Sequence, residues 1–166
     1  MTLVVPSDGS TLSETALVRA VQFDAVFDQG VRAVSVVPRN STTYARARGW
    51  IGPAESFGYQ QIVDELRASV EEIAPKATFD HISVGRNAPA GTIANRIRTF
   101  ARTNDASIVF IGTENAGRMV GSLSVGPSVS AEQSYDTMSI SQARPSKIAE
   151  LEAAVSTEGA MLSSGE

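Results

Sequence analysis

The chain has 166 residues, 42% of them apolar, and its 18 acidic and 14 basic residues leave a net charge of −4. This composition is typical of one soluble globular domain, and the negative charge argues against an electrostatic interface for nucleic acid. The sequence lacks cysteine, a signal-peptide pattern and any apolar stretch as long as a membrane span, which excludes disulfide and thiolate chemistry and predicts a cytoplasmic location.

The first predicted element is a short buried strand at residues 3–5, which Pro6-Ser7-Asp8-Gly9-Ser10 ends abruptly. In an open α/β sheet, ligands bind outside the carboxyl ends of the strands, where the strand order reverses. Asp8 is therefore a candidate ligand contact. The alternative is that Asp8 and Ser10 only cap the turn and the helix that follows.

A helix is predicted next, because Thr11-Leu12-Ser13-Glu14 matches a capping box and apolar residues follow at helical spacing. Gly30 is the expected end of this helix, and residues 31–37 are predicted to form a strand. Residues 39–56 show no clear period and are expected to form a long, partly mobile excursion. The aromatic side chains expected to attach it to the protein body are Tyr44, Trp50 and Phe57.

Helices and strands continue to alternate as far as residue 111. A helix is predicted at 60–73, a strand at 79–84, a helix opened by Pro89, and an apolar strand at 107–111. The apolar stripes of the two helices are Ile62, Leu66, Val70 and Ile73, and Ile93, Ala94, Ile97, Phe100 and Ala101. This alternation predicts a doubly wound α/β sheet.

The C-terminal part of the chain is predicted to complete the sheet and then extend beyond it. The expected elements are a polar helix at 128–135, a fifth strand at 137–143 with Met138 and Ile140 inward, and a short amphipathic helix in the tail. Residues 1–144 are thus predicted to form one α/β domain, and residues 145–166 a C-terminal extension that ends in a frayed segment.

A second candidate site segment follows the strand at 107–111. Residues 112–130 are rich in Gly and Ser, and glycine lets backbone amides approach a phosphate, while a helix N-terminus adds unpaired N–H groups. Arg118 adds positive charge. The same composition is typical of a flexible loop. Because this segment and Asp8 follow different strands of one sheet, we expect them to share a crevice.

Three motifs, in this order, resemble the universal stress protein family. They are Val-Val-Pro-x-Asp-Gly-Ser-x-x-Ser from Val4, Pro89-Ala90-x-x-Ile93, and Asp105-Ala106-Ser107-Ile108-Val109-Phe110-Ile111-Gly112-Thr113. The resemblance covers residues 2 to about 141 and implies an open sheet of about five parallel strands with helices on both faces. It also implies stress response signalling, homodimers formed through the last strands and, in one branch of the family, binding of ATP or AMP. The apolar stripe of the C-terminal extension is a second candidate for the dimer contact, or it packs on its own subunit.

In that branch, residues after the first strand contact the nucleotide, and a valine late in the second strand meets adenine. The resemblance carries these roles to Pro6, Ser7, Asp8 and Val36, with Val37 as the next match. It also implies contacts around the segment after the fourth strand, at Ile111, Gly112, Asn115, Gly117, Gly126, Ser128, Val129 and Ser130. A metal would reach Asp8 only as nucleotide-bound Mg²⁺.

The phosphate segment departs from the family pattern of Gly, two residues, Gly, nine residues, Gly and then Ser or Thr. Asn115 replaces the second glycine, and ten residues rather than nine separate it from Gly126. Pro127, which follows Gly126, removes a backbone N–H. Asparagine tolerates the left-handed backbone region, and Gly117 and Gly121 add freedom. Two hypotheses result: a non-catalytic module that binds ATP or AMP, and a dimeric interaction scaffold of the same fold that has lost nucleotide binding.

The sequence does not support the other functions that proteins with a related sheet perform. A phospho-receiver needs an Asp at the end of the third strand, where this chain has Val84-Gly85-Arg86, and no G-x-G-x-x-G follows the first strand. ATP hydrolysis is expected to be very slow at most, because no general base or second carboxylate accompanies Asp8. His81 has no His or Cys cluster, so a structural or surface role is expected rather than a metal site.

Overall fold

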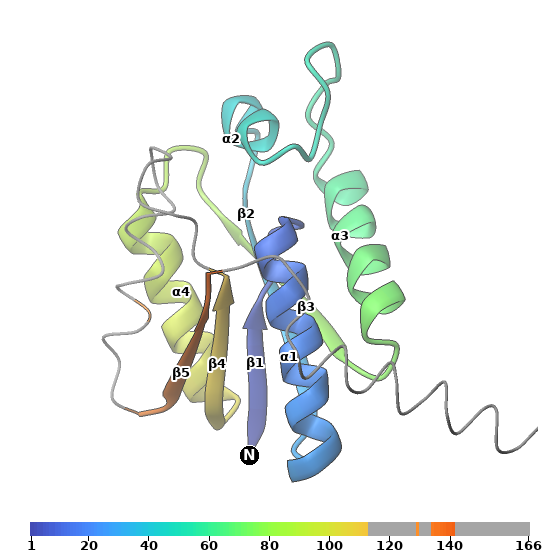
Figure 1. Ribbon diagram of the computed structural model, residues 1–166. Helices are drawn as coiled ribbons and strands as arrows, with labels where there is room; N and C mark the ends of the chain where they lie inside the picture. The colour runs from blue at the N-terminus through green and yellow to red at the C-terminus, as the bar shows by residue number, and fades with distance from the viewer. Residues whose placement is uncertain (113–128, 130–133, 142–166) are drawn as a thin grey trace, which may run out of the picture.

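The computed structural model describes residues 1–112, 129 and 134–141, which form a five-stranded sheet flanked by helices (Figure 1). The strands are β1 (Thr2–Pro6), β2 (Val31–Pro38), β3 (Thr78–Val84), β4 (Ala106–Gly112) and β5 (Asp136–Ile140). The helices are α1 (Thr11–Phe27), α2 (Thr42–Ala47), α3 (Tyr59–Ile73) and α4 (Ala90–Thr103). All neighbouring strands are parallel, which confirms the predicted α/β fold.

The chain builds the sheet outward from β1 in two directions, in the order β3-β2-β1-β4-β5. It first adds β2 and β3 on one side, and then returns to add β4 and β5 on the other side. The strand order therefore reverses between β1 and β4. Open α/β sheets bind their ligands beside the carboxyl ends of the strands at such a switch point.

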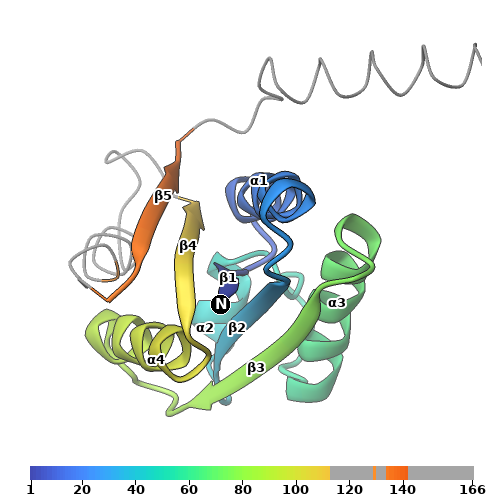
Figure 2. The same cartoon turned by 90° about the horizontal axis from the view of Figure 1, so that it is seen from below.

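Alternate side chains of the strands enter two cores on opposite faces of the sheet. Leu3 and Val5 pack in a core with residues of α1 and α3, whereas Val4 packs in a core with residues of α4. Figure 2 shows α1 and α3 on one face and α4 on the other. Phe110 is fully buried on the α1 face, where its ring meets Phe23 edge-on with the centroids 5.3 Å apart. Burial on both faces explains the continuous apolar runs of the central strands.

The first helix is capped by Ser10, as the capping alternative for this turn predicts, but it ends before the predicted residue Gly30. Its N-cap is Ser10, whose hydroxyl accepts a hydrogen bond from the Ser13 backbone N–H at 3.2 Å, rather than Thr11. At the other end, Asp28 is the C-cap with a φ of 49°, two residues before Gly30. The predicted capping box at residues 11–14 thus lies one residue after the true N-cap, and Gly30 belongs to the connection that leads into β2.

Residues 39–56 contain the short helix α2, which the sequence does not predict. Ala45, Trp50 and Ile51 are buried against α3 and β2, so the segment is part of the protein body. Trp50 attaches it, as predicted, and Tyr44 and Phe57 pack against the same cluster. A helix of six residues completes fewer than two turns, and so it leaves no apolar period in the sequence.

The fifth strand begins at Asp136, one residue earlier than predicted, and ends at Ile140 rather than at residue 143. Met138 and Ile140 pack in the core on the α1 face, as predicted. Most of the helix predicted at 128–135 and all of the extension predicted at 145–166 lie outside the described residues. Within the described part, no helix has the length and apolar character needed to cross a membrane.

Candidate functional site

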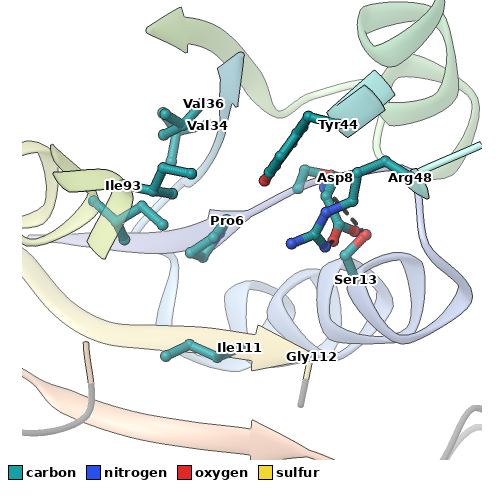
Figure 3. A pocket seen from close by; sticks show the side chains of 12 residues that line it. Pro6, Asp8, Ser13, Val34, Val36, Tyr44, Arg48, Ile93, Ile111 and Gly112 are labelled. Carbon is teal, nitrogen blue, oxygen red and sulfur yellow. Dashed lines mark hydrogen bonds and ion pairs between the residues drawn. The ribbon is translucent and has the colours of Figure 1, made fainter. Parts of the chain in front are cut away.

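A cleft opens at the carboxyl ends of β1, β2 and β4, beside the switch point of the sheet (Figure 3). The cleft is open to solvent over part of its surface. Its walls come from three strands, the first turn of α1, the segment around α2, and α4. The lining residues are Pro6, Ser7, Asp8, Ser13, Val34, Val36, Tyr44, Arg48, Ile93, Ile97, Ile111 and Gly112.

The structure brings half of the predicted site residues together in this cleft. They are Pro6, Ser7, Asp8, Val36, Ile111 and Gly112. Val129 is 1% exposed and packs in the core on the α4 face, where its carbonyl accepts a hydrogen bond from the Tyr135 hydroxyl at 2.8 Å. The remaining predicted contacts lie outside the described residues: Asn115, Gly117, Gly126, Ser128 and Ser130.

The turn between β1 and α1 is held by hydrogen bonds from its own side chains. Asp8 Oδ1 accepts from the Ser10 backbone N–H at 2.9 Å, and the Ser13 hydroxyl donates to the Ser10 carbonyl at 3.0 Å. From β2, the buried Ser35 hydroxyl donates to the carbonyl of Ser7. Asp8 and Ser10 therefore stabilise the turn and cap the helix, as the alternative interpretation expects, while Asp8 also lines the cleft.

Arg48, the C-cap residue of α2, forms an ion pair with the Asp8 carboxylate across the cleft. Its guanidinium carbon also lies 5.1 Å from the centroid of the Tyr44 ring, and the Trp50 indole N–H donates to the Asp8 carbonyl at 2.7 Å. Neither Tyr44 nor Arg48 was predicted to belong to the site. The only sequence signal is their spacing of four residues, which places two side chains on one face of a helix.

The surroundings of Asp8 and Tyr44 fix the protonation state of each side chain. Burial by itself raises the pKa of the Asp8 carboxyl, but Arg48 and the hydrogen bonds from Ser10 and Ser13 outweigh it, so this pKa lies below its usual 3.8. Burial raises the pKa of the Tyr44 hydroxyl above its usual 10.0. At neutral pH Asp8 is therefore a carboxylate and Tyr44 a neutral phenol.

Gly112 allows β4 to approach the first turn of α1. A Cβ atom at this position would stand 2.7 Å from the carbonyl carbon of Leu12 and 2.8 Å from the backbone nitrogen of Ser13. The sequence predicts that a glycine here lets backbone amides approach a phosphate. The structure shows a second requirement, because the contact between β4 and α1 leaves no room for a side chain.

The cleft is divided into an apolar part and a polar part. The apolar side is lined by aliphatic side chains of β2 and α4 that pack in one core, and they are Val34, Val36, Ile93 and Ile97. Asp8, Arg48 and Ser13 lie together at the polar end, near Gly112 (Figure 3). This division suits a ligand that joins a flat apolar group to a charged one.

A second hollow lies at the opposite end of the sheet, between α1 and the loop that leads into β3. Its lining residues are Val21, Asp24, Val31, Ala74, Pro75, Lys76 and Ala77. None of the predicted site residues is among them. His81 lies elsewhere, exposed on β3, with its Nδ1 hydrogen-bonded to the Tyr59 hydroxyl at 2.9 Å. Among the described residues, no group of three or more His, Cys, Asp or Glu side chains is placed to hold a metal ion.

Residues 1–131 match the family model of the universal stress protein family. No curated protein sequence gives a significant match. Among solved structures, the universal stress protein UspA from Lactobacillus plantarum superimposes with a TM-score of 0.56 and 17% identity, over 84% of this chain and 97% of that one.

Two further solved structures carry a nucleotide. A universal stress protein in complex with cAMP has a TM-score of 0.53 and 20% identity, over 84% of this chain and 96% of that one. The Archaeoglobus fulgidus universal stress protein in complex with dAMP has a TM-score of 0.52 and 17% identity, over 84% of this chain and 97% of that one. At such low identity these similarities establish the fold alone.

Proposed function

Because this chain belongs to the universal stress protein family, we propose that its cleft binds an adenine nucleotide and that the protein acts as a non-catalytic module in stress response signalling. The observation that carries the proposal is the division of the cleft into an apolar and a polar part at the switch point of the sheet. Six residues expected to contact nucleotide line this one cleft.

The two parts of the cleft match the two parts of a nucleotide. In the proposed arrangement, the base lies against the aliphatic wall that β2 and α4 form together, and the sugar and phosphate extend toward Asp8, Arg48 and Gly112. The fold neighbours in complex with cAMP and dAMP support adenine as the base. AMP and ATP are both proposed ligands, since residues 113–128, which would decide between them, lie outside the described part.

The proposal of a non-catalytic role rests on the chemistry of the cleft. Among the described lining residues, Asp8 is the only acid, and none is His, Cys or Lys. The Asp8 carboxylate is already paired with Arg48, which lowers its basicity and makes it a poor general base. The Tyr44 hydroxyl is protonated at neutral pH, since burial raises its pKa further above the usual 10.0.

Nucleotide binding is tested by thermal unfolding of the full chain with increasing AMP, cAMP or ATP. A ligand that binds only the folded state stabilises it by about 2.7 kcal/mol at a concentration of 100 times Kd, so the melting temperature is expected to rise with concentration. Inorganic phosphate at matched ionic strength is the control. An unchanged melting temperature at millimolar nucleotide would contradict the proposal and favour the interaction scaffold.

We also propose that the protein is a cytoplasmic homodimer formed through β5. This strand pairs with β4 along one edge, and no described strand covers its other edge. Sedimentation velocity is expected to give twice the mass of one chain, both for the full protein and for a chain that ends at Arg144. A monomeric full chain would refute the dimer, and a monomeric truncated chain would assign the contact to the tail instead.

A further inference from the structure

Arg48 directs a partly buried side chain to the polar end of the cleft. Its side chain is 19% exposed, and it contacts Asp8 through Nη1 while lying over the Tyr44 ring. A guanidinium carries five N–H donors in a rigid fork, more than these contacts use. Ser13 and Gly112 line the same part of the cleft, so the fork faces the space where the phosphate is proposed to lie.

The Asp8 carboxylate does not fit the role of a magnesium ligand. Oδ1 accepts the Ser10 backbone N–H, and Oδ2 is paired with Arg48. Mg²⁺ requires near-octahedral oxygen coordination, commonly from one or two carboxylates together with phosphate and water. No second acid lines the described part of the cleft, and the Arg48 charge repels a cation at this position.

We propose that Arg48 takes the place of a divalent cation in this cleft: it neutralises Asp8 and binds a phosphate group of the nucleotide, so that binding does not require Mg²⁺. Arginine suits this role because its planar fork pairs with phosphate through charge-assisted hydrogen bonds, which strengthen when water is partly excluded. The inference rests on the proposed binding of adenine nucleotide.

The first test compares nucleotide affinities of the wild-type chain with and without metal. Isothermal titration with AMP and ATP is carried out in EDTA and again in excess Mg²⁺. The two dissociation constants for each nucleotide are expected to agree within about twofold, a difference well below 1 kcal/mol by the affinity relation. Adenosine, which has the base and sugar without phosphate, is titrated under the same conditions.

The second test changes the charge at residue 48. In Arg48→Gln the phosphate meets an uncompensated Asp8 carboxylate, so the affinity for AMP in EDTA is expected to fall about tenfold or more. Mg²⁺ is expected to restore part of this loss, and Arg48→Lys to keep more affinity than Arg48→Gln. The affinity for adenosine is expected to stay within about twofold of the wild type, because no phosphate contact is lost.

Arg46 provides the matched control, because it lies on α2, is exposed and does not line the cleft. Arg46→Gln removes the same charge and should leave every affinity unchanged. A requirement for Mg²⁺ in the wild type would overturn the inference alone, and so would equal losses of AMP and adenosine in Arg48→Gln, which indicate a purely structural role. Failure of the wild type to bind any of these ligands would overturn the proposed function and this inference together.

Discussion

Replacing Gly112 with alanine is expected to lower the free energy of unfolding by about 3 kcal/mol, at the upper end of the usual cost of overpacking. The new Cβ would stand 2.7 Å from the Leu12 carbonyl carbon, 2.8 Å from the Ser13 nitrogen and 2.9 Å from the Leu12 Cβ. The two closest are backbone atoms that cannot rotate away, so β4 and α1 must separate. The same movement should weaken nucleotide binding, because both elements line the cleft.

Gly91, the second residue of α4, is the matched control for this substitution. A Cβ at Gly91 would meet no atom within 4 Å. Gly91→Ala is therefore expected to raise the free energy of unfolding by about 0.5 kcal/mol, since it reduces the freedom of the unfolded chain. Urea unfolding followed by circular dichroism measures both changes. A Gly112→Ala chain within about 0.5 kcal/mol of the wild type, the range of ordinary surface substitutions, would refute the close contact between β4 and α1.

Replacing Trp50 with alanine is expected to lower the free energy of unfolding by about 4 kcal/mol, as for other large aromatic side chains removed from a core. Trp50 is 9% exposed, packs against residues of α2, α3 and β2, and donates its indole N–H to the Asp8 carbonyl. Its ring centroid also lies 5.5 Å from that of Tyr44. The loss of these contacts should release α2 from the sheet, so that Arg48 is no longer held against Asp8.

Two further variants separate the contributions of Trp50. Trp50→Phe keeps a ring but leaves the Asp8 carbonyl without its donor, at an expected cost of about 1–3 kcal/mol. Phe27→Ala is the control, because Phe27 is 55% exposed and its removal should have a much smaller effect. Trp50 is the only tryptophan, so unfolding is followed by circular dichroism. A cost below about 1 kcal/mol for Trp50→Ala would show that this residue does not anchor the segment.

The parts of the fold that the sequence predicts are those with a long or regular apolar pattern. The stripe of α3, with Ile62, Leu66 and Val70 buried, follows from helical spacing alone. The central strands are covered on both faces and so appear as apolar runs. The location of Asp8 in the cleft follows from topology, since the carboxyl ends of parallel strands share one edge of the sheet.

The polar partners within the cleft could not be predicted in the same way. Arg48 meets Asp8 across 40 positions of sequence, from a helix too short to show a period. The requirement for glycine at residue 112 depends on the distance between β4 and α1, which no local pattern encodes. The sequence therefore predicts the site residues at the ends of three strands, whereas the pairing of Arg48 with Asp8 depends on tertiary packing.

The most direct measurement of the central claim is a titration of the isotope-labelled full chain with AMP, followed by the amide signals in nuclear magnetic resonance spectra. Saturable shifts are expected for Ser7, Asp8, Val36 and Gly112, which line the cleft. The amide signals of Val31 and Ala77, which line the hollow at the opposite end of the sheet, should not shift. Shifts confined to that hollow, or no saturable shift at millimolar AMP, would contradict nucleotide binding at the carboxyl ends of the strands.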